Sequence, residues 1–259
     1  MLTLYTYALR HFLEQNPDAA ATKIKWENKV GLTRFAPAHY PHIEVQKIVL
    51  KRLDPALLDP RLTCPKNLAS TEAVIINMDY PLGLAVKHLL SKACKRFSRL
   101  RGVFILGKSA ATIGRLGDIM IPSQVFDSHT GNRYCFSNSL SVRMLFPFLN
   151  RIAAFDDQKS ITVRGTFLHG RSTVNHLIND DFTGIEMEAG PYLDALYQYF
   201  SGQSTPCNKE LKLDTPPDFN LGLLHYTSDT PYNVRPSLLS SRLGLTGLEA
   251  AYASSLAIL

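Results

Sequence analysis

The chain has 259 residues, which is enough for one large domain or two small ones with a full hydrophobic core. Hydrophobic residues make up 45% and charged residues 19%, a globular composition that excludes a disordered or fibrous chain. The 28 basic and 22 acidic residues give a formal net charge of +6, but only residues 92–101 hold a basic cluster, which we interpret as a solvated helix face rather than a nucleic-acid site.

The cysteine spacing and the hydropathy pattern indicate in which cellular compartment the protein is expected. The four cysteines, at positions 64, 94, 135 and 207, lie far apart without metal-ligand spacing, so we expect reduced thiols. No apolar run reaches the ~18 residues that a membrane span requires. Residues 1–12 lack the basic start, sustained apolar core and cleavage site of a signal peptide. The sequence therefore predicts a cytoplasmic protein with neither nucleic acid nor a membrane as partner.

The N-terminal region, residues 1–72, has an atypical pattern. Residues 2–15 place apolar side chains at helical spacing and predict an amphipathic helix that ends at Asn16-Pro17. Residues 17–68 contain repeated prolines and show little periodicity outside residues 42–53. We interpret this region as either a connecting segment or an unusual N-terminal extension. The remaining residues, 73–259, are expected to form one compact domain.

A clear α/β pattern begins at residue 73. Residues 73–78 and 102–107 are short continuous apolar runs, typical of central parallel strands that are buried on both faces. Residues 84–96 predict a helix between them, which makes a parallel crossover unit. Ligands bind such sheets at the carboxyl ends of the strands. We expect an α/β fold with a mixed, largely parallel central sheet flanked by helices.

Further elements follow in chain order. Strands are expected at residues 117–122, 161–168 and 221–226, and polar loops at residues 127–132 and 201–220. Helices are expected at residues 140–154 with a kink or break at Pro147, at residues 170–179 with a loop as the alternative, and at residues 191–200 and 237–259.

Residues 184–194 place two carboxylates in a segment otherwise suited to burial. Glu186 and Glu188 alternate with Ile185 and Met187, so a strand end here would pack one face and present carboxylates on the other. A buried carboxylate needs a hydrogen-bonding partner, either protein or ligand. The alternative is that both glutamates lie in the first turn of the next helix, where negative charge suits the helix dipole.

Three predicted strands end in polar or small residues: Lys108-Ser109, Glu186-Met187-Glu188 and Ser228-Asp229. This set, in this order, resembles the nucleoside phosphorylase and nucleosidase superfamily, whose members cleave the glycosidic bond between a base and a ribosyl group. The segment Glu-Met-Glu-Ala looks like the family's ribose-binding segment, and Ser-Asp looks like its base-site pair. The resemblance covers residues 73–235, and nothing before them matches.

Other segments resemble motifs on the family's phosphate side. Residues 107–111, Gly-Lys-Ser-Ala-Ala, are similar to its Gly-Ser/Thr-Ala/Cys-Gly loop, and residues 117–122 to its Gly-Asp-Ile-Val-Ile-Pro strand. Residues 78–81, Met-Asp-Tyr-Pro, are similar to its Met-Gly-Ile-Pro loop. The resemblance therefore makes these residues candidates for substrate binding: Gly107, Lys108, Ser109 and Asp79.

The resemblance also implies roles for the remaining candidates. Glu188 would bind the 2'- and 3'-hydroxyls of the sugar, with Glu186 in support, and Met187 would pack on the sugar face. Asp229, beside Ser228, would protonate or hydrogen-bond a purine base as it leaves an oxocarbenium-like transition state. Phe167 or His169 could stack on the base, although ordinary core packing is the alternative for Phe167.

Departures from the family pattern concern phosphate. Ile105 stands where the family has an arginine, Lys108 where it has a serine, and Asp79 where it has a glycine. A carboxylate beside a phosphate dianion is repulsive, although Lys108, if it is not simply a solvated loop lysine, could compensate. Three hypotheses remain: a hydrolytic nucleosidase, which we favour, a phosphorylase that uses Lys108 for phosphate, and a non-catalytic nucleoside-binding or scaffolding relative.

Other polar residues carry weaker signals. Asp127 and His129 lie in a polar segment that is either a hydrogen-bonded turn or a loop facing substrate or an interface. His169 and His176 lack a third ligand at metal-binding spacing, and no Gly-rich nucleotide fingerprint is present. We therefore expect no cofactor and no metal. By analogy with the family we expect a homo-oligomer that binds a nucleoside or base, with phosphate as a possible second ligand.

Overall fold

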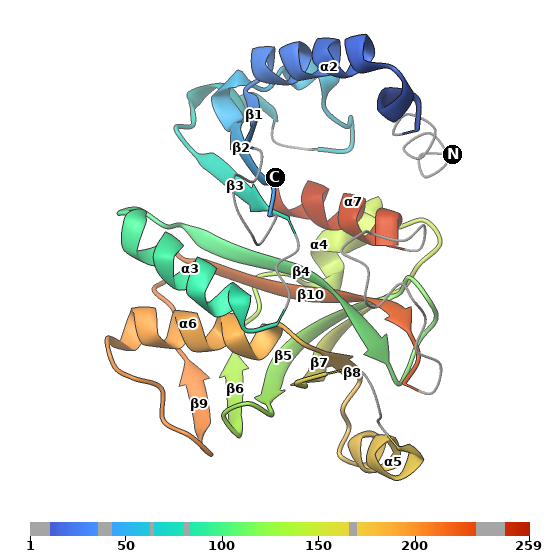
Figure 1. The fold of residues 1–259 in the computed structure, drawn as a ribbon, viewed down its shortest axis with the longest axis vertical. Coiled ribbons are helices and arrows are strands. Elements are labelled where there is room, and N and C mark those ends of the chain that lie inside the picture. Colours follow the sequence, from blue (N-terminus) through green and yellow to red (C-terminus); the bar gives the residue numbers. More distant parts are fainter. Residues whose placement is uncertain (1–10, 36–42, 63–64, 80–82, 166–169, 232–246) are drawn as a thin grey trace. The chain divides into compact units, whose positions relative to one another are not determined.

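The computed structural model describes residues 11–35, 43–62, 65–79, 83–165, 170–231 and 247–259. Contacts within the chain divide it into two units: Met1–Pro81 with Leu259, and Leu82–Ile258. Figure 1 shows the helices and strands of each unit. The candidate site residues fall almost entirely in the second unit.

The first unit contains a helix and a small antiparallel sheet. Residues 11–15 are helical, and helix α2 (Pro17–Lys29) begins with proline at its first position, where the missing N–H costs nothing. The sheet has the order β1-β2-β3, formed by β1 (Leu32–Phe35), β2 (Val45–Val49) and β3 (Val74–Met78). Short 3-10 turns connect β2 to β3 at Leu50–Arg52, Pro55–Leu57 and Pro65–Ser70.

Strand β3 corrects one expectation. The predicted central parallel strand at residues 73–78 lies at the edge of this antiparallel sheet, paired with β2 only. Val74 is 43% exposed, so the strand is not buried on both faces. The predicted parallel crossover between residues 73–78 and residues 102–107 is therefore wrong, because β3 and the strand at residues 102–107 belong to different sheets. A short apolar run does not reveal which sheet a strand joins.

Arg34 holds the parts of the first unit together. Its Nε donates to Glu27 Oε2 at 2.7 Å and its Nη2 to Glu27 Oε1 at 2.9 Å, a bidentate contact from β1 to α2. Its Nη1 donates to Glu44 Oε1 at 2.5 Å, just before β2. Lys23 makes a second ion pair with Glu27. These contacts lower the pKa of Glu27, with the Arg34 hydrogen bond as the largest cause.

The second unit contains a seven-stranded mixed sheet of order β10-β4-β8-β7-β5-β6-β9. Its strands are β4 (Gly102–Ala111), β5 (Ile119–Asp127), β6 (Asn132–Phe136), β7 (Ala154–Thr162), β8 (Gly184–Glu186), β9 (Glu210–Leu213) and β10 (Asn220–Asp229). The pairs β10–β4, β5–β7, β7–β8 and β6–β9 are parallel, and β4–β8, β5–β6 and β10–β5 are antiparallel. Because β10 also pairs with β5, five strands form a closed ring.

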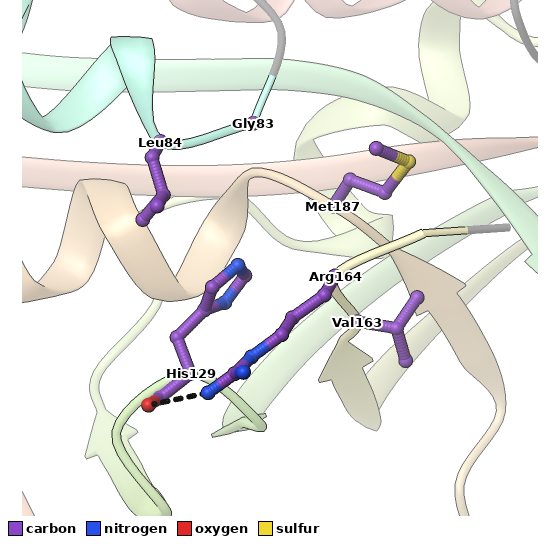
Figure 2. Close-up of a pocket in the computed structure, with 6 residues that line it drawn as sticks. All are labelled: Gly83, Leu84, His129, Val163, Arg164 and Met187. Carbon is purple, nitrogen blue, oxygen red and sulfur yellow. Dashed lines mark hydrogen bonds between the residues drawn. The ribbon is translucent and has the colours of Figure 1, made fainter.

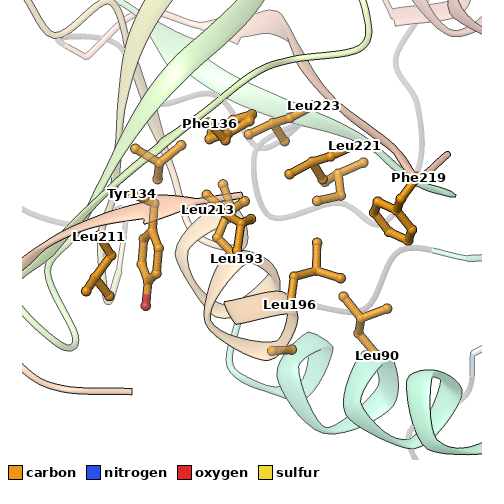
Figure 3. Close-up of a cluster of buried hydrophobic side chains, with 14 of the residues drawn as sticks. Leu90, Tyr134, Phe136, Leu193, Leu196, Leu211, Leu213, Phe219, Leu221 and Leu223 are labelled. Carbon is orange, nitrogen blue, oxygen red and sulfur yellow. The ribbon is translucent and has the colours of Figure 1, made fainter. Parts of the chain in front are cut away.

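Helices cover both faces of this sheet. Helices α3 (Ala85–Arg96) and α6 (Ala189–Ser201) run beside each other on one face (Figure 1). Their apolar side chains meet strand residues in the main core, shown in Figure 3: Leu90, Leu193, Leu196, Leu221 and Leu223. On the other face, helix α7 (Gly247–Ile258) begins against the Tyr226 ring. The expected mixed α/β sheet flanked by helices is confirmed.

Individual elements agree with the expectations to different degrees. The predicted helices at residues 84–96, 170–179 and 191–200 are α3, α5 (Arg171–Asn179) and α6. The predicted helix at residues 140–154 is only α4 (Val142–Leu145) with a 3-10 turn at Phe146–Phe148, because Pro147 stops it. The strand expected at residues 161–168 begins earlier, as β7, and the loop expected at residues 201–220 contains β9. Residues 237–246 of the closing helix lie outside the described residues.

Candidate functional site

Three predicted strand-end motifs lie on neighbouring strands. Strand β4 lies between β10 and β8, and its residues pair directly with both. Thr227 is opposite Ser109, and Ala110 is opposite Ile185. Ser228 Oγ donates to the Ser109 carbonyl at 3.4 Å, beside an irregularity between Thr227 and Asp229. The sheet therefore brings Ser228-Asp229, Lys108-Ser109 and Glu186-Met187-Glu188 together at one end of its ring.

Glu186 is a buried carboxyl group held by local donors. Its Oε2 accepts from the backbone N–H of Glu188 at 2.7 Å and of Ala189 at 2.6 Å, and its Oε1 accepts from Thr162 Oγ1. Burial and the nearby charge of Glu188 raise the pKa of Glu186 to about 8, while these hydrogen bonds oppose the rise. Glu186 is 2% exposed, so it anchors the β8–α6 turn more directly than it meets a ligand.

His225, which the sequence analysis missed, lies beside Glu186. Its Nε2 is 3.8 Å from Glu186 Oε2, and the ring is 1% exposed. Burial lowers the pKa of His225 to about 4, so the ring is neutral at neutral pH and the contact is not an ion pair. A Cβ at Gly107 would come within 2.7 Å of the His225 ring, so glycine at this predicted site residue makes room for the imidazole.

Glu188 is placed where the chain turns from β8 into α6. It is the N-cap residue of α6 and is 6% exposed. Its Oε1 accepts the backbone N–H of Gly83 at 3.1 Å, which connects it to the start of α3. Each of the two alternatives given by the sequence therefore holds for one glutamate. Glu186 is the last residue of a strand, and Glu188 caps the start of a helix.

Lys108 is a buried strand residue rather than a solvated loop lysine. It is 4% exposed and lies within β4, opposite Tyr226. Burial lowers the pKa of Lys108, whereas the carboxylates of Asp229 and Glu188 favour its charged form. A buried ammonium group requires such counter-charges. Lys108 therefore interacts electrostatically with the two residues that the resemblance makes catalytic.

Strands β4, β7 and β10 also carry buried hydroxyl groups in this part of the sheet. Ser109, Thr227 and Ser160 are fully or almost fully buried. Among the described residues, their hydroxyl oxygens and His225 Nδ1 have no hydrogen-bond partner. Ser160 and Ser109 both lie near the position that a Cβ would take at Gly184. Buried polar atoms of this kind are commonly satisfied by ordered water or by a ligand.

An open cavity of about 470 Å³ lies beside these motifs, and Figure 2 shows the residues that line it. They come from the start of α3, the β5–β6 turn, the end of β7 and the β8–α6 turn: Gly83, Leu84, His129, Val163, Arg164 and Met187. Of these residues, Met187 belongs to the predicted substrate-binding set, and His129 to the polar segment for which a loop facing substrate was one alternative. Arg164, just after β7, was missed, although a basic residue following a predicted strand end could have marked it.

The β5–β6 turn fixes His129 at the cavity. Asp127 Oδ1 accepts from the His129 backbone N–H at 3.0 Å and lies 2.8 Å from its Nδ1, and Asp127 Oδ2 accepts from Thr130 Oγ1 at 2.8 Å. The alternative of a hydrogen-bonded turn is confirmed for Asp127. His129 nevertheless lines the cavity, so the same turn presents a histidine to it.

Three predicted candidates lie outside the described part of the second unit. Asp79 follows β3 in the first unit, where it is exposed and its backbone N–H donates to the Glu44 carbonyl at 2.8 Å. Phe167 and His169 lie outside the described residues. Across the described part of the chain, no three His, Cys, Asp or Glu residues form a metal-binding group. No helix in those same ranges is long and apolar enough to cross a membrane.

Comparisons with known proteins concern the family and the fold. The model of a family of unknown function (DUF6909) matches residues 2–259. No curated protein matches the sequence significantly.

Solved structures, by contrast, match over most of the chain. A 5'-methylthioadenosine/S-adenosylhomocysteine nucleosidase from Colwellia psychrerythraea in complex with adenine has a TM-score of 0.57 at 12% identity, covering 90% of this chain and 88% of that chain. A futalosine hydrolase mutant from Helicobacter pylori has a TM-score of 0.54 at 11% identity, covering 92% and 93%.

A third match is a 5'-methylthioadenosine/S-adenosylhomocysteine nucleosidase from Neisseria meningitidis in complex with methylthio-immucillin-A. Its TM-score is 0.54 at 10% identity, with coverage of 90% of this chain and 92% of that chain. At such low identities the likeness shows the fold. The resemblance to the nucleoside phosphorylase and nucleosidase superfamily is thereby confirmed for the architecture.

Proposed function

Because the chain belongs to a protein family of unknown function (DUF6909) and has the nucleosidase fold, we propose that it hydrolyses the N-glycosidic bond of a nucleoside. One observation carries this proposal. The neighbouring strands β10, β4 and β8 bring together a buried Ser-Asp pair, a buried lysine and a Glu-Met-Glu segment. Residues far apart in the sequence thus supply an acid for a leaving group and a carboxylate for sugar hydroxyls.

The proposed chemistry assigns one task to each side chain. Glu188 accepts hydrogen bonds from the 2'- and 3'-hydroxyls, and Met187 packs on the sugar face. Asp229 donates a proton or a hydrogen bond to the base as negative charge develops on it, and Ser228 helps to orient the base. The sugar gains positive charge in the same step, so carboxylates around it lower the barrier. Water then adds to the anomeric carbon, and the proton that it releases replaces the one that Asp229 gave to the base.

The surroundings of Lys108 favour water over phosphate as the attacking group. Lys108 is buried and its charge is balanced by Asp229 and Glu188. A lysine engaged in this way has little capacity left to neutralise a phosphate dianion. The residue at the family's arginine position is Ile105, which is 5% exposed and packs in the main core. Neither position therefore offers the free cation that phosphorolysis needs.

Base release from a nucleoside panel tests the proposal. Adenosine, inosine, guanosine and uridine are incubated with the protein with and without inorganic phosphate, and the free base is quantified by chromatography. We expect release of at least one purine base without phosphate. Release that requires phosphate would contradict the hydrolytic assignment and support a phosphorylase. No release, with no thermal shift on adding nucleosides or bases, would contradict nucleoside cleavage and favour a scaffolding relative.

A purine substrate, a homo-oligomeric state and a cytoplasmic location complete this proposal. The purine preference is supported by the Ser-Asp pair and by adenine in the Colwellia nucleosidase complex. Light scattering of the purified protein tests oligomerisation, and the nucleoside panel tests the base.

A further inference from the structure

The open cavity next to Met187 contains a cationic side chain that the proposed chemistry does not use. Arg164 lines it from the end of β7, and Met187 lines it from the β8–α6 turn. In Figure 2 the Arg164 side chain extends along the cavity toward His129. Its Nη2 donates to the His129 carbonyl at 3.4 Å, which is a long hydrogen bond. Within the described residues, no carboxylate lies within ion-pair distance of this guanidinium.

His129 adds a second polar group on the same side of the cavity. Because its Nδ1 faces Asp127 Oδ1 at 2.8 Å, its Nε2 is the ring nitrogen that remains for another partner. Asp127 also accepts from the His129 backbone N–H and from Thr130 Oγ1, so its carboxylate is occupied within the turn. The ring is therefore held in one orientation while it lines the cavity.

The acidic groups nearby are already engaged. Glu188 accepts from Gly83 and interacts with Lys108, and Asp127 is held by its own turn. The guanidinium of Arg164 therefore lines the cavity as a positive charge, and no carboxylate among the described residues pairs with it. Guanidinium groups bind phosphate and carboxylate oxygens through paired hydrogen bonds.

We propose that Arg164, with His129 beside it, binds an anionic group, phosphoryl or carboxylate, carried by the sugar of the substrate. This inference rests on the proposed function, because it places the sugar against Met187. Met187 and Arg164 line the same cavity, so a substituent on a sugar that packs against Met187 can reach the guanidinium. The substrate class would then be a nucleoside with an anionic sugar substituent, and Arg164 would determine that specificity.

Calorimetric binding tests this site without requiring turnover. The probes are adenosine, adenosine 5'-monophosphate and inorganic phosphate, each titrated into the full-length protein and its Arg164→Met variant, which keeps the aliphatic stem. We expect the monophosphate to bind about tenfold more tightly than adenosine, as one charge-assisted contact at an open site would give. Arg164→Met should remove that difference and leave adenosine binding within about twofold.

Two further variants refine the test. Arg164→Lys should retain part of the preference, and Arg143→Met, which removes an exposed arginine of α4 outside the cavity, should retain all of it. If inorganic phosphate alone binds in an Arg164-dependent manner and the monophosphate has no advantage over adenosine, free phosphate and not a sugar substituent is the ligand, and the proposal is overturned. Equal binding of both nucleosides, or a preference that survives in Arg164→Met, overturns it as well.

The same data separate this proposal from the proposed function. Arg164-dependent preference for the monophosphate without base release from any nucleoside would support the anion site and contradict the nucleosidase activity. Base release from a nucleoside, together with equal binding of adenosine and adenosine 5'-monophosphate, would support the nucleosidase activity and contradict the anion site.

Discussion

Glu188 and Asp229 are the side chains on which the proposed chemistry depends. Both are buried, and both interact electrostatically with Lys108. Glu188→Gln keeps the shape but removes the charge that binds the hydroxyls, and Asp229→Asn removes the acid. We expect each to lower the rate of base release by about a hundred- to ten-thousandfold. Circular dichroism should show an intact fold, and Glu210→Gln at an exposed position is the control. Normal rates in either site variant would refute the assignment.

The pH dependence of stability follows from Glu186 and His225. The pKa of Glu186 rises from 4.5 in the unfolded chain to about 8 in the folded protein. Its contribution to the stability of the fold is therefore fully present below pH 4.5 and is lost as the pH rises to 8. The pKa of His225 falls from 6.5 to about 4, so its contribution is present above 6.5 and is lost as the pH falls to 4. Between about pH 4.5 and 6.5 the two contributions to the free energy of unfolding cancel, because His225 regains its contribution as the pH rises while Glu186 loses its own.

Between pH 6.5 and 8 only the Glu186 effect remains, and we expect the free energy of unfolding to fall by up to about 1.4 kcal/mol per pH unit. Glu186→Gln should flatten this slope in urea unfolding at several pH values. Glu210→Gln, at an exposed glutamate, should leave the slope unchanged. A wild-type stability that is constant or rises over this interval would show that Glu186 remains ionised in the folded protein.

Residue types and their order identified the strand-end motifs, but not the environment of each side chain. The sequence around Lys108 is compatible with either a solvated or a buried side chain. The pairing of β4 with both β10 and β8 is what makes it buried. His225 was missed because a lone histidine in an apolar run carries no signal of its own. Arg164 and His129 become neighbours only when the end of β7 meets the β5–β6 turn.

At the scale of elements, the close approach of α6 to β5 positions the site. Gly190, in the first turn of α6, lies very near Asp127. A Cβ added at Gly190 would come within 2.6 Å of the Cβ and Cγ atoms of Asp127. The Gly190 backbone N–H donates to Thr162 Oγ1 at 2.8 Å, which in turn contacts Glu186. The absence of a side chain here thus allows the helix start, the β5–β6 turn and the Glu186 network to pack together.

Gly190→Ala should therefore destabilise the second unit by about 1–3 kcal/mol, because the added methyl group must displace the helix or the turn. Gly170→Ala is the matched control, since a Cβ there meets nothing within 4 Å. We expect that control to change stability by less than about 0.5 kcal/mol in urea unfolding. An equal effect of the two substitutions would indicate that the α6 contact is not tight.

Elements with an apolar stripe were predictable, and those without one were not. Helix α3 buries Val86, Leu90 and Cys94 on one face, which produces the helical period in its sequence. Helix α2 buries no residue, so its sequence carries no such period. The first half of β7 is mostly exposed or half-buried, and its strand pattern was assigned too late in the chain.

At the scale of the whole molecule, each unit has its own sheet and its own side-chain hydrogen bonds. The Arg34 network lies entirely in the first unit, between α2, β1 and Glu44. Arg34→Met should raise amide hydrogen exchange in α2 and β1 by about two- to fivefold, because a partly exposed ion pair contributes about 1 kcal/mol or less. Exchange in β4 and β10 should not change. Arg101→Met, which removes an exposed pair with Asp218, should leave α2 unaffected.

The general architecture was predictable because alternating strands and helices restrict the possible sheets. The sheet to which β3 belongs was not predictable, because its neighbours β1 and β2 are short and rich in polar residues. Strand pairing depends on partners that are distant in sequence. Local pattern therefore identified most elements of the second unit and fewer of the first.

The closed ring of five strands has a consequence for how the protein is made. Strand β10 supplies the last two pairings, with β4 and with β5, and Ser228 lies 119 residues after its contact Ser109. Until β10 has left the ribosome, β4 and β5 each have an unpaired backbone edge, the feature that promotes aggregation in incomplete sheets. Folding of the second unit is therefore a late, long-range event. A nascent chain that stalls before Asn220 therefore exposes two open edges with which other chains can pair.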